Sequence, residues 1–368
     1  MNTRWLVLSV AAAVVAAPRI AVHEAQTLPE PLPRPGFHHI HMSSVDPSAA
    51  IAELITVYPA STKVTLAGFE GVKSANNVTM LFTKVNTRPP APGPDRITRA
   101  APQTAFWHHV WSTPDARAVL DRLRKADPQR LTQGGSRFIP QYTGPKGGTV
   151  DFSSDTFSGF LTTIQVEEAT RKGLVPARNG GYFNWYGPDG VVMETADAGG
   201  GAEAYRIVGM FQEQPFCAVF WYQRHLNAAD SPASSRGTAG GPGSTGSGAA
   251  TGLAGPVSEA DCKVSRGSDV SWPSTYKRGH YRIPPAQSVY FDDVQLRWYM
   301  NQENSPLAST RGQLMDHIAL GVTNLDAWIA KLRRENVKVL EQPYAFGDAR
   351  AVMIEGPSRE AIELVEKK

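Results

Sequence analysis

The sequence predicts an α+β fold made of four repeated βαβββ modules, each a strand, a helix and about three further strands. Each module begins with a phrase that recurs four times: an apolar, strand-like run that ends seven residues later at a residue able to cap a helix. A helix with one apolar stripe follows each copy. Because a small sheet with one helix cannot bury both of its faces, we expect the modules to pair.

The four phrases fix the helix starts. They begin at His39, His108, Ile207 and His317 and end at Asp46, Asp115, Gln214 and Asn324. Aspartate and asparagine accept a backbone N–H well at an N-cap, whereas glutamine is a weaker cap. Spacings of three and four place the apolar residues that follow on one helix face. These stripes are Ile51, Leu54, Ile55 and Tyr58; Ala116, Val119, Leu120 and Leu123; Phe216, Val219 and Phe220; and Leu325, Trp328, Ile329 and Leu332.

A second repeat supports the first. Strand-like runs follow the first and last helices, at Thr62–Leu66, Val78–Val85, Val337–Leu340, Ala351–Glu355 and Ala361–Val365. A Gly-Pro turn begins at Gly187 and again at Gly356, and a glutamate lies seven residues after each glycine, at Glu194 and Glu363. A carboxylate among apolar strand residues is costly to bury unless it is paired or bound to a metal.

The chain ends and two insertions differ from the modules. We expect residues 1–25 to be a secretory signal, with an uncleaved lipid-facing anchor as the alternative, and the Pro-rich residues 26–35 to be a tether. Residues 161–172 predict an extra helix. Residues 228–256 are rich in Gly, Ser and Ala and predict a disordered surface loop.

The composition excludes some classes of function. The formal net charge is only +3 and no basic run is present, so a nucleic-acid partner is not expected. With 41% apolar residues the chain is typical of a globular protein. Cys217 and Cys262 either pair after export or remain free, with Cys217 buried in a helix.

With these phrases and turns, the chain resembles the vicinal oxygen chelate superfamily, which includes glyoxalase I, fosfomycin and bleomycin resistance proteins and extradiol dioxygenases. The resemblance covers nearly all of residues 36–366 outside the insertions. It implies two β-sheet cups, each made of two modules around a divalent metal. The expected domains are residues 36–200, holding modules one and two, and residues 201–368, holding modules three and four.

The resemblance also implies which residues bind the metal, because the family takes its ligands from the first and last strands of the modules. Modules one and two offer His39, His108 and Glu194, a 2-His-1-Glu set suited to Fe(II), Mn(II) or Zn(II). The alternative is separate histidines and a hydrogen-bonded glutamate. Modules three and four offer only His317 and Glu363, since Ile207 stands in place of a third ligand, so we expect a degenerate second site there. In the ring-cleaving relatives the C-terminal pair usually carries the metal.

Strand alternation suggests residues around this metal. His41 lies two residues from His39 and faces the same side, so it is a candidate acid/base or hydrogen-bond donor, or else a packed histidine. His109 has the opposite parity to His108. Tyr142 and Tyr186, with the neighbouring Trp185, either line the cup as catalytic or binding residues or pack in the core.

The sequence therefore favours an exported, metal-dependent enzyme of the glyoxalase or dioxygenase kind, periplasmic or extracellular, that acts on a small oxygenated molecule. The first alternative is a metal-free protein that binds or sequesters a small ligand, as in bleomycin resistance. The second is a structural or interaction protein. No stable membrane span is expected after signal cleavage, and two cups in one chain make an oligomer unnecessary.

Overall fold

A computed structural model describes residues 32–90, 103–127, 139–143, 149–150, 175–197, 201–229, 258–260, 262, 287–300 and 306–367. Residues 33–368 form one compact unit. The expected signal at 1–25, most of the tether at 26–35, the helix at 161–172 and nearly all of the loop at 228–256 lie outside the described residues. In the described part, no helix is long and apolar enough to span a bilayer.

The first and last modules have the expected order of elements. Module one comprises β1 (Gly36–Ser44), α1 (Pro47–Val57), β2 (Thr62–Leu66), β3 (Phe69–Lys73) and β4 (Thr79–Lys84). Module four comprises β13 (Met315–Val322), α6 (Leu325–Arg334), β14 (Val339–Phe346), β15 (Ala349–Glu355) and β16 (Ala361–Glu366).

The two middle modules follow the same plan. Module two comprises β5 (Phe106–Thr113), α2 (Ala116–Ala126), β6 (Ile139–Thr143), β7 (Thr149–Val150), β8 (Val175–Tyr186), the 3-10 turn η3 (Pro188–Gly190) and β9 (Val192–Asp197). Module three comprises β10 (Ala204–Gln212), α4 (Pro215–Leu226), β11 (Gln287–Phe291) and β12 (Val294–Met300).

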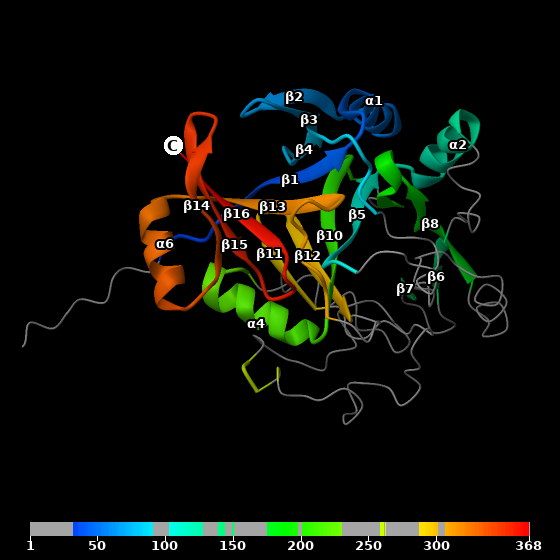
Figure 1. The fold of residues 1–368 in the computed structure, drawn as a ribbon. Helices are drawn as coiled ribbons and strands as arrows, with labels where there is room; N and C mark the ends of the chain where they lie inside the picture. Colours follow the sequence, from blue (N-terminus) through cyan, green and yellow to red (C-terminus); the bar gives the residue numbers. More distant parts are fainter. Residues whose placement is uncertain are drawn as a thin grey trace, which may run out of the picture. The chain divides into compact units, whose positions relative to one another are not determined.

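Two eight-stranded sheets result, and each contains two modules (Figure 1). The first has the order β14-β15-β16-β13-β1-β4-β3-β2, and the second has the order β11-β12-β10-β5-β9-β8-β6-β7. In the first sheet β1 and β13 pair antiparallel at the centre, and each is flanked by the parallel last strand of its own module. In the second sheet β5 and β10 take the same central places.

The modules pair differently from the expected domains. Module one shares its sheet with module four, and module two shares its sheet with module three. The expected pairing of modules one and two in residues 36–200, and of three and four in 201–368, is therefore corrected. The physical reason is that every module leaves one edge of its first strand open; β13 completes the edge of β1, and β10 completes that of β5.

Modules adjacent in sequence instead meet through helices and turns. The Tyr58 ring, just after α1, stacks on Trp111 of β5 with centroids 4.5 Å apart, and the Tyr58 hydroxyl lies 2.8 Å from Thr195 Oγ1 of β9. On the other side, Tyr222 of α4 donates to Glu360 Oε1 at 2.8 Å. The buried Glu360 carboxylate lies in the turn before β16, so it joins module three to module four.

The helices begin at the expected caps. Asp46, Asp115 and Asn324 accept backbone N–H groups at 3.0, 2.9 and 3.1 Å, whereas Gln214 makes no side-chain cap bond. The residues of each stripe are mostly buried, and Trp328 of α6 is fully so. Cys217 and Cys262 are free thiols, and Cys217 is only partly buried in α4.

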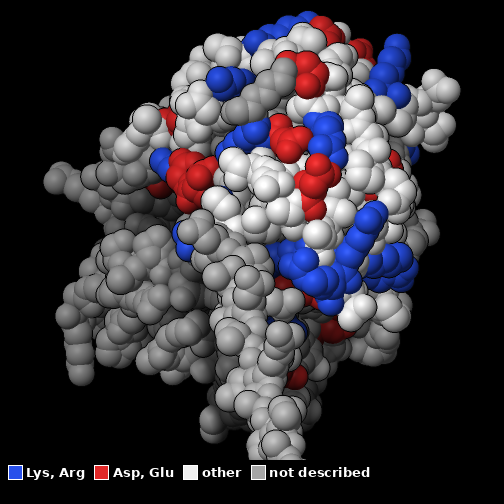
Figure 2. Space-filling model, turned by 90° about the vertical axis from the view of Figure 1, so that its left-hand side faces the viewer, with Lys and Arg blue, Asp and Glu red and all other residues white. Residues whose placement is uncertain are grey.

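The face that includes α6 carries mixed charge. Figure 2 shows lysine and arginine side chains interspersed with acidic ones on this side. Some charged residues of module four pair: Arg350 contacts Asp326, and Lys331 lies 2.9 Å from Glu335.

The N-cap of α6 offers a test of these local assignments. Asn324 adopts φ +54° while its side chain caps Ala327 N, so it supplies both the left-handed conformation and the cap. We predict that Asn324→Ala lowers the free energy of unfolding by about 1–2 kcal/mol, because alanine loses the cap and tolerates this φ poorly. Asn324→Gly should cost only a few tenths of a kcal/mol, because glycine accepts the conformation. Urea unfolding followed by tryptophan fluorescence measures both, and equal losses would contradict the assignment.

Candidate metal centre

The centre of the first sheet gathers three histidines and a glutamate from two modules. His39 and His41 alternate along β1, so both side chains leave the same face of the sheet. His41 is directly opposite His317 of β13, and His39 is opposite Ala319, whose neighbour on β16 is Glu363. The antiparallel pairing of β1 with β13 therefore brings together residues nearly three hundred positions apart in sequence.

The donor atoms converge. His39, His41 and His317 each offer one ring nitrogen, and these nitrogens lie within 4.8 Å of one another. The Glu363 Oε2 atom lies 3.4 Å from His39 Nε2 and 3.7 Å from His317 Nε2. All four side chains are buried. The arrangement is a compact group of three imidazoles and one carboxylate.

Each imidazole has its other nitrogen held by a neighbour. His39 Nδ1 lies 2.7 Å from His38 Nδ1, His41 Nε2 lies 2.7 Å from Thr83 Oγ1, and His317 Nδ1 lies 2.6 Å from Asp316 Oδ1. If each held nitrogen carries the ring proton and donates it, the opposite nitrogen presents a lone pair to the centre of the group. Such outer partners fix the ring orientation and the tautomer of metal-binding histidines.

The inward-facing atoms are the ones that lack partners. Within the described residues, His39 Nε2, His41 Nδ1, His317 Nε2 and Glu363 Oε2 are buried and have no hydrogen-bond partner. Buried polar atoms are rarely left in this state, because desolvation without a new bond costs free energy. A cation ligated by all four would satisfy them together, so these residues fit a divalent metal.

Burial keeps two of the imidazoles neutral. Burial, followed by the nearby His317, lowers the pKa of His41 to about 3. Burial also lowers the pKa of His39 well below its usual value, helped by His317 and His38. Neutral imidazole is the form that binds a metal. His39 and His41 are therefore in the protonation state that a ligand role requires.

His317 behaves differently because of its carboxylate neighbours. Although burial acts to lower it, the pKa of His317 is raised by Asp316 and Glu363. In turn, the pKa values of Asp316 and Glu363 are held below their usual range, against burial, chiefly by His317. The carboxylates are thus ionised at neutral pH, which is the form that attracts a cation.

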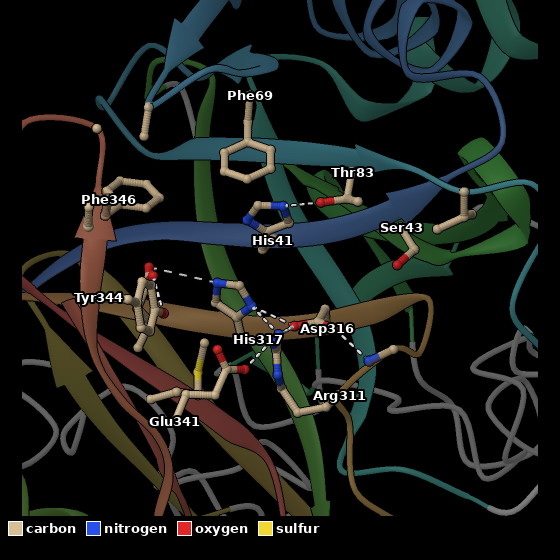
Figure 3. Close-up of a pocket in the computed structure, with 17 residues that line it drawn as sticks. His41, Ser43, Phe69, Thr83, Arg311, Asp316, His317, Glu341, Tyr344 and Phe346 are labelled. Atoms are coloured by element: carbon tan, nitrogen blue, oxygen red, sulfur yellow. Dashed lines mark hydrogen bonds and ion pairs between the residues drawn. The ribbon is translucent and has the colours of Figure 1, made fainter. Parts of the chain in front are cut away.

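A cavity of about 420 Å³ opens onto this group (Figure 3). Figure 3 shows His41 and His317 side by side on adjacent strands, with Phe69 and Phe346 nearby. Tyr344 of β14 donates to Glu363 Oε1 at 2.6 Å, which leaves Oε2 as the inward-facing oxygen. Arg311, at the cavity wall, contacts both Asp316 and Glu341.

The structure separates the triad expected from the sequence. His39 lies on β1 of the first sheet, whereas His108 and Glu194 lie on β5 and β9 of the second. The expected grouping of these three residues is therefore corrected, and the reason is the pairing of module one with module four. His317 and Glu363, expected to form a degenerate site, join His39 instead.

The second sheet has the corresponding positions but few donors. His108 Nε2 lies 3.8 Å from Glu194 Oε2. Ile207 is opposite Val110 where the first sheet has His317 opposite His41. Gly209 is opposite His108 and pairs with Arg297, so a guanidinium stands at the register position of Glu363. A Cβ on Gly209 would lie 2.2 Å from His108 Cε1, so the His108 ring lies directly over this glycine.

The other expected site residues also belong to the second sheet. Tyr142 lies on β6 and Tyr186 on β8, which are strands of the second sheet. Their expected place in one cup with His39 is therefore corrected, because His39 lies on β1 of the first sheet. Trp185 is a buried core residue whose Nε1 donates to Thr195 Oγ1 at 3.1 Å. His109 Nδ1 lies 2.7 Å from the Tyr205 hydroxyl.

Several residues of the site carry no recognisable pattern in the sequence. Thr83 reaches the cavity from β4, Glu341 and Tyr344 reach it from β14, and Arg311 reaches it from the loop before β13. Asp316 is the exception, because an aspartate directly before a strand histidine is a visible signal for an orienting carboxylate.

No protein-family model and no curated protein sequence matches this chain. Among solved structures, a single-residue variant of glyoxalase I from Zea mays has a TM-score of 0.51 at 12% identity, covering 90% of this chain and 92% of that one. Glyoxalase I from Zea mays itself has a TM-score of 0.49 at 11% identity, with 90% and 92% covered. A putative dioxygenase from Bacillus subtilis has a TM-score of 0.45 at 10% identity, with 91% and 86% covered.

The first of these similarities extends over nearly the whole of both chains, and at 12% identity it concerns the fold alone. A match over 90% of this chain agrees with a fold built from four modules in two mixed sheets. The chain therefore has the fold of glyoxalase I, as the resemblance in the sequence implied, with its modules paired first to fourth and second to third.

Proposed function

We propose that this protein is a metal-dependent enzyme that acts on a small oxygenated molecule in the cavity of the first sheet. The observation that carries the proposal is the set of four inward-facing atoms of His39, His41, His317 and Glu363. They are buried, lie close together, and have no hydrogen-bond partner among the described residues. Three of them belong to imidazoles whose opposite nitrogens are held by neighbours.

The donor set limits the choice of metal. Imidazole nitrogen and carboxylate oxygen suit Fe(II), Mn(II) and Zn(II), whereas a site for Ca(II) or Mg(II) would be built from oxygens. The solved structures named above are called glyoxalase and dioxygenase, and these names do not decide among the three metals. Export, which the apolar N-terminal run favours, is part of the proposal.

A divalent metal bound here would supply Lewis-acid chemistry toward a substrate oxygen. The protein's own residues would hold and orient the groups around it. Asp316 orients His317 through its Nδ1, and Tyr344 holds Glu363 through its Oε1. Because Glu363 and the Tyr344 hydroxyl bond directly, burial and this carboxylate raise the pKa of Tyr344 far above its usual value, so the phenol keeps its proton and acts as a donor.

Metal content distinguishes this site from the triad expected from the sequence. We predict that His317→Ala and Glu363→Ala each reduce the metal retained after reconstitution by about tenfold or more, because each removes a ligand from a buried set. The matched controls are His108→Ala and Glu194→Ala in the second sheet, which should retain metal like the unaltered protein. Mass-spectrometric metal analysis of anaerobically purified protein gives the measurement.

The opposite pattern of metal retention would contradict the proposal. Loss of metal from the His108 and Glu194 variants, with metal kept by the His317 variant, would place the site in the second sheet. Unaltered protein that stays free of Fe, Mn and Zn after reconstitution would favour the metal-free binding protein instead.

Metal binding should also depend on pH through His317. A proton competes with the metal for His317 Nε2, so affinity is full above the pKa of His317 and falls as the pH drops through it. Asp316 raises that pKa. Asp316→Asn should therefore shift the midpoint of the affinity loss to lower pH, while weakening the affinity at high pH by roughly 10–100-fold because the orienting partner is lost.

Chelator competition with Zn(II) across the acidic and neutral range measures both changes. Asp326→Asn, which alters an exposed carboxylate paired with Arg350, serves as the control. A midpoint that stays in place in the Asp316 variant would show that this carboxylate does not set the basicity of His317.

A further inference from the structure

The two ends of the first sheet touch each other. In its strand order, the hairpin β14–β15 lies at one end and the hairpin β2–β3 lies at the other. Gly347 is in the turn of the first hairpin and Ala67 is in the turn of the second. A Cβ on Gly347 would lie 3.2 Å from both Cα and Cβ of Ala67. The sheet therefore curls until its opposite edges are in contact.

Both turns are suited to this close approach. Each has two residues, Ala67 and Gly68 between β2 and β3, and Gly347 and Asp348 between β14 and β15. The φ angles of Ala67, Gly68 and Gly347 are +52°, +87° and +61°, as tight hairpin turns require. Ala67 and Gly347 hold the same position in their hairpins, and their small size lets the two backbones meet.

Apolar packing joins the two hairpins beside the candidate metal centre. Phe346, at the end of β14, is only 7% exposed and belongs to a buried cluster against which Leu66, Ala67 and Phe69 of the other hairpin pack. The rings of Phe346 and Phe69 have centroids 6.5 Å apart. Ala67, Phe69, Phe346 and Gly347 also line the cavity. The joined hairpins therefore cover the cavity from one side.

Each hairpin also contacts one imidazole of β1. Phe346 stacks on His39, with centroids 5.1 Å apart and planes inclined by 9°. Phe69 meets His41 edge to face, with centroids 4.6 Å apart and an angle of 84°. Figure 3 shows these two phenylalanines on different hairpins, with Phe69 beside His41. Because ring contacts of this kind are favourable and directional, each hairpin restrains the orientation of one imidazole.

We propose that the two hairpins form a clasp over the candidate metal centre. Ala67 and Gly347 hold the clasp closed, and Phe346 and Phe69 are positioning residues for the two imidazoles of β1. Elements at the edge of a structure open locally more easily than core strands do. Opening of the clasp frees the two rings, so it limits the rate at which a bound metal is lost. This rests on the proposed function, because it takes these imidazoles as metal ligands.

An engineered disulfide tests the clasp. On a Cys217→Ser, Cys262→Ser background, Ala67→Cys and Gly347→Cys place two thiols at the contact, where the 3.2 Å between Cβ positions is close to the roughly 3.5–4.5 Å of a disulfide. Oxidised glutathione converts the two thiols to a disulfide and is itself reduced to two thiols. Protein loaded with Co(II) and then oxidised should lose the metal to a chelator at least about fivefold more slowly than the same protein kept reduced, because the clasp cannot open.

The matched control cross-links one hairpin to itself. Thr62 and Lys73 are directly opposite each other on β2 and β3, so a Thr62→Cys, Lys73→Cys pair does not join the two hairpins. Its oxidation should leave the rate of Co(II) loss unchanged. Equal rates for the oxidised and reduced clasp variant would refute the proposal, and so would a clasp pair that mass spectrometry finds without a cross-link after oxidation.

Phe346→Ala tests the positioning role. This variant should raise the Co(II) dissociation constant roughly threefold to tenfold and shift the Co(II) absorption bands, because the His39 ring loses its stacked neighbour. Phe346→Tyr keeps the aromatic ring and should restore both. Phe69→Ala should act in the same way through His41. Absorption bands that stay in place in both alanine variants would show that neither phenylalanine positions a ligand.

Phe291→Ala separates positioning from stability. Phe291 is fully buried on β11 of the second sheet, so its loss destabilises the fold without touching the candidate ligands. Its Co(II) bands and dissociation constant should match those of the unaltered protein, and a shift equal to that of Phe346→Ala would contradict the positioning role. Unaltered protein that binds no Co(II) refutes the proposed function, whereas metal-loaded protein whose cross-link leaves the rate unchanged refutes the clasp alone.

Discussion

The antiparallel pairing of β1 with β13 is the constraint on which the candidate site depends. It sets His41 opposite His317 and His39 opposite Ala319, and the parallel neighbour β16 then places Glu363 beside that position. None of these four side chains could form a metal centre within its own module, because module one supplies two imidazoles and module four supplies one imidazole and the carboxylate. The site exists only where the open edges of two first strands meet.

The same pairing explains why so many polar groups are buried together. Three imidazoles and a carboxylate at a sheet centre would be unfavourable in a protein that used them only for packing, since four of their atoms find no hydrogen bond among the described residues. The surrounding partners are arranged in the opposite way. His38, Thr83, Asp316 and Tyr344 each satisfy the outward atom of one member of the cluster. A ligand set is expected to have its outward atoms hydrogen-bonded and its inward atoms without such partners, because only the inward atoms remain for a cation.

Much of the local structure could be predicted from the sequence. The caps at Asp46, Asp115 and Asn324, the buried stripes and the strand Thr62–Leu66 all depend on neighbours within a few positions, and the structure confirms them. Which modules share a sheet depends on contacts between distant segments, for which the repeated phrase holds no signal, since all four copies present similar edges. The repeated phrase and the Gly-Pro turns were enough to identify His39, His317 and Glu363 as candidate metal donors. They were not enough to predict that these three residues lie together. Residues such as Tyr344 and Arg311 lie in unremarkable contexts and become visible only when β14 and the loop before β13 are placed.

The pairing of the modules explains why one of the four repeated phrases begins with Ile207 and the other three begin with histidine. Taken in sequence order, Ile207 looks like a ligand lost from the site of His317 and Glu363. In the structure Ile207 belongs to the other sheet, where it faces Val110, and where Arg297 holds the position that corresponds to Glu363. A guanidinium at that position repels a cation, and an isoleucine and a valine offer no lone pair. The absence of donors at these positions of the second sheet therefore leaves the candidate ligand set of the first sheet complete, because that set comes from modules one and four alone.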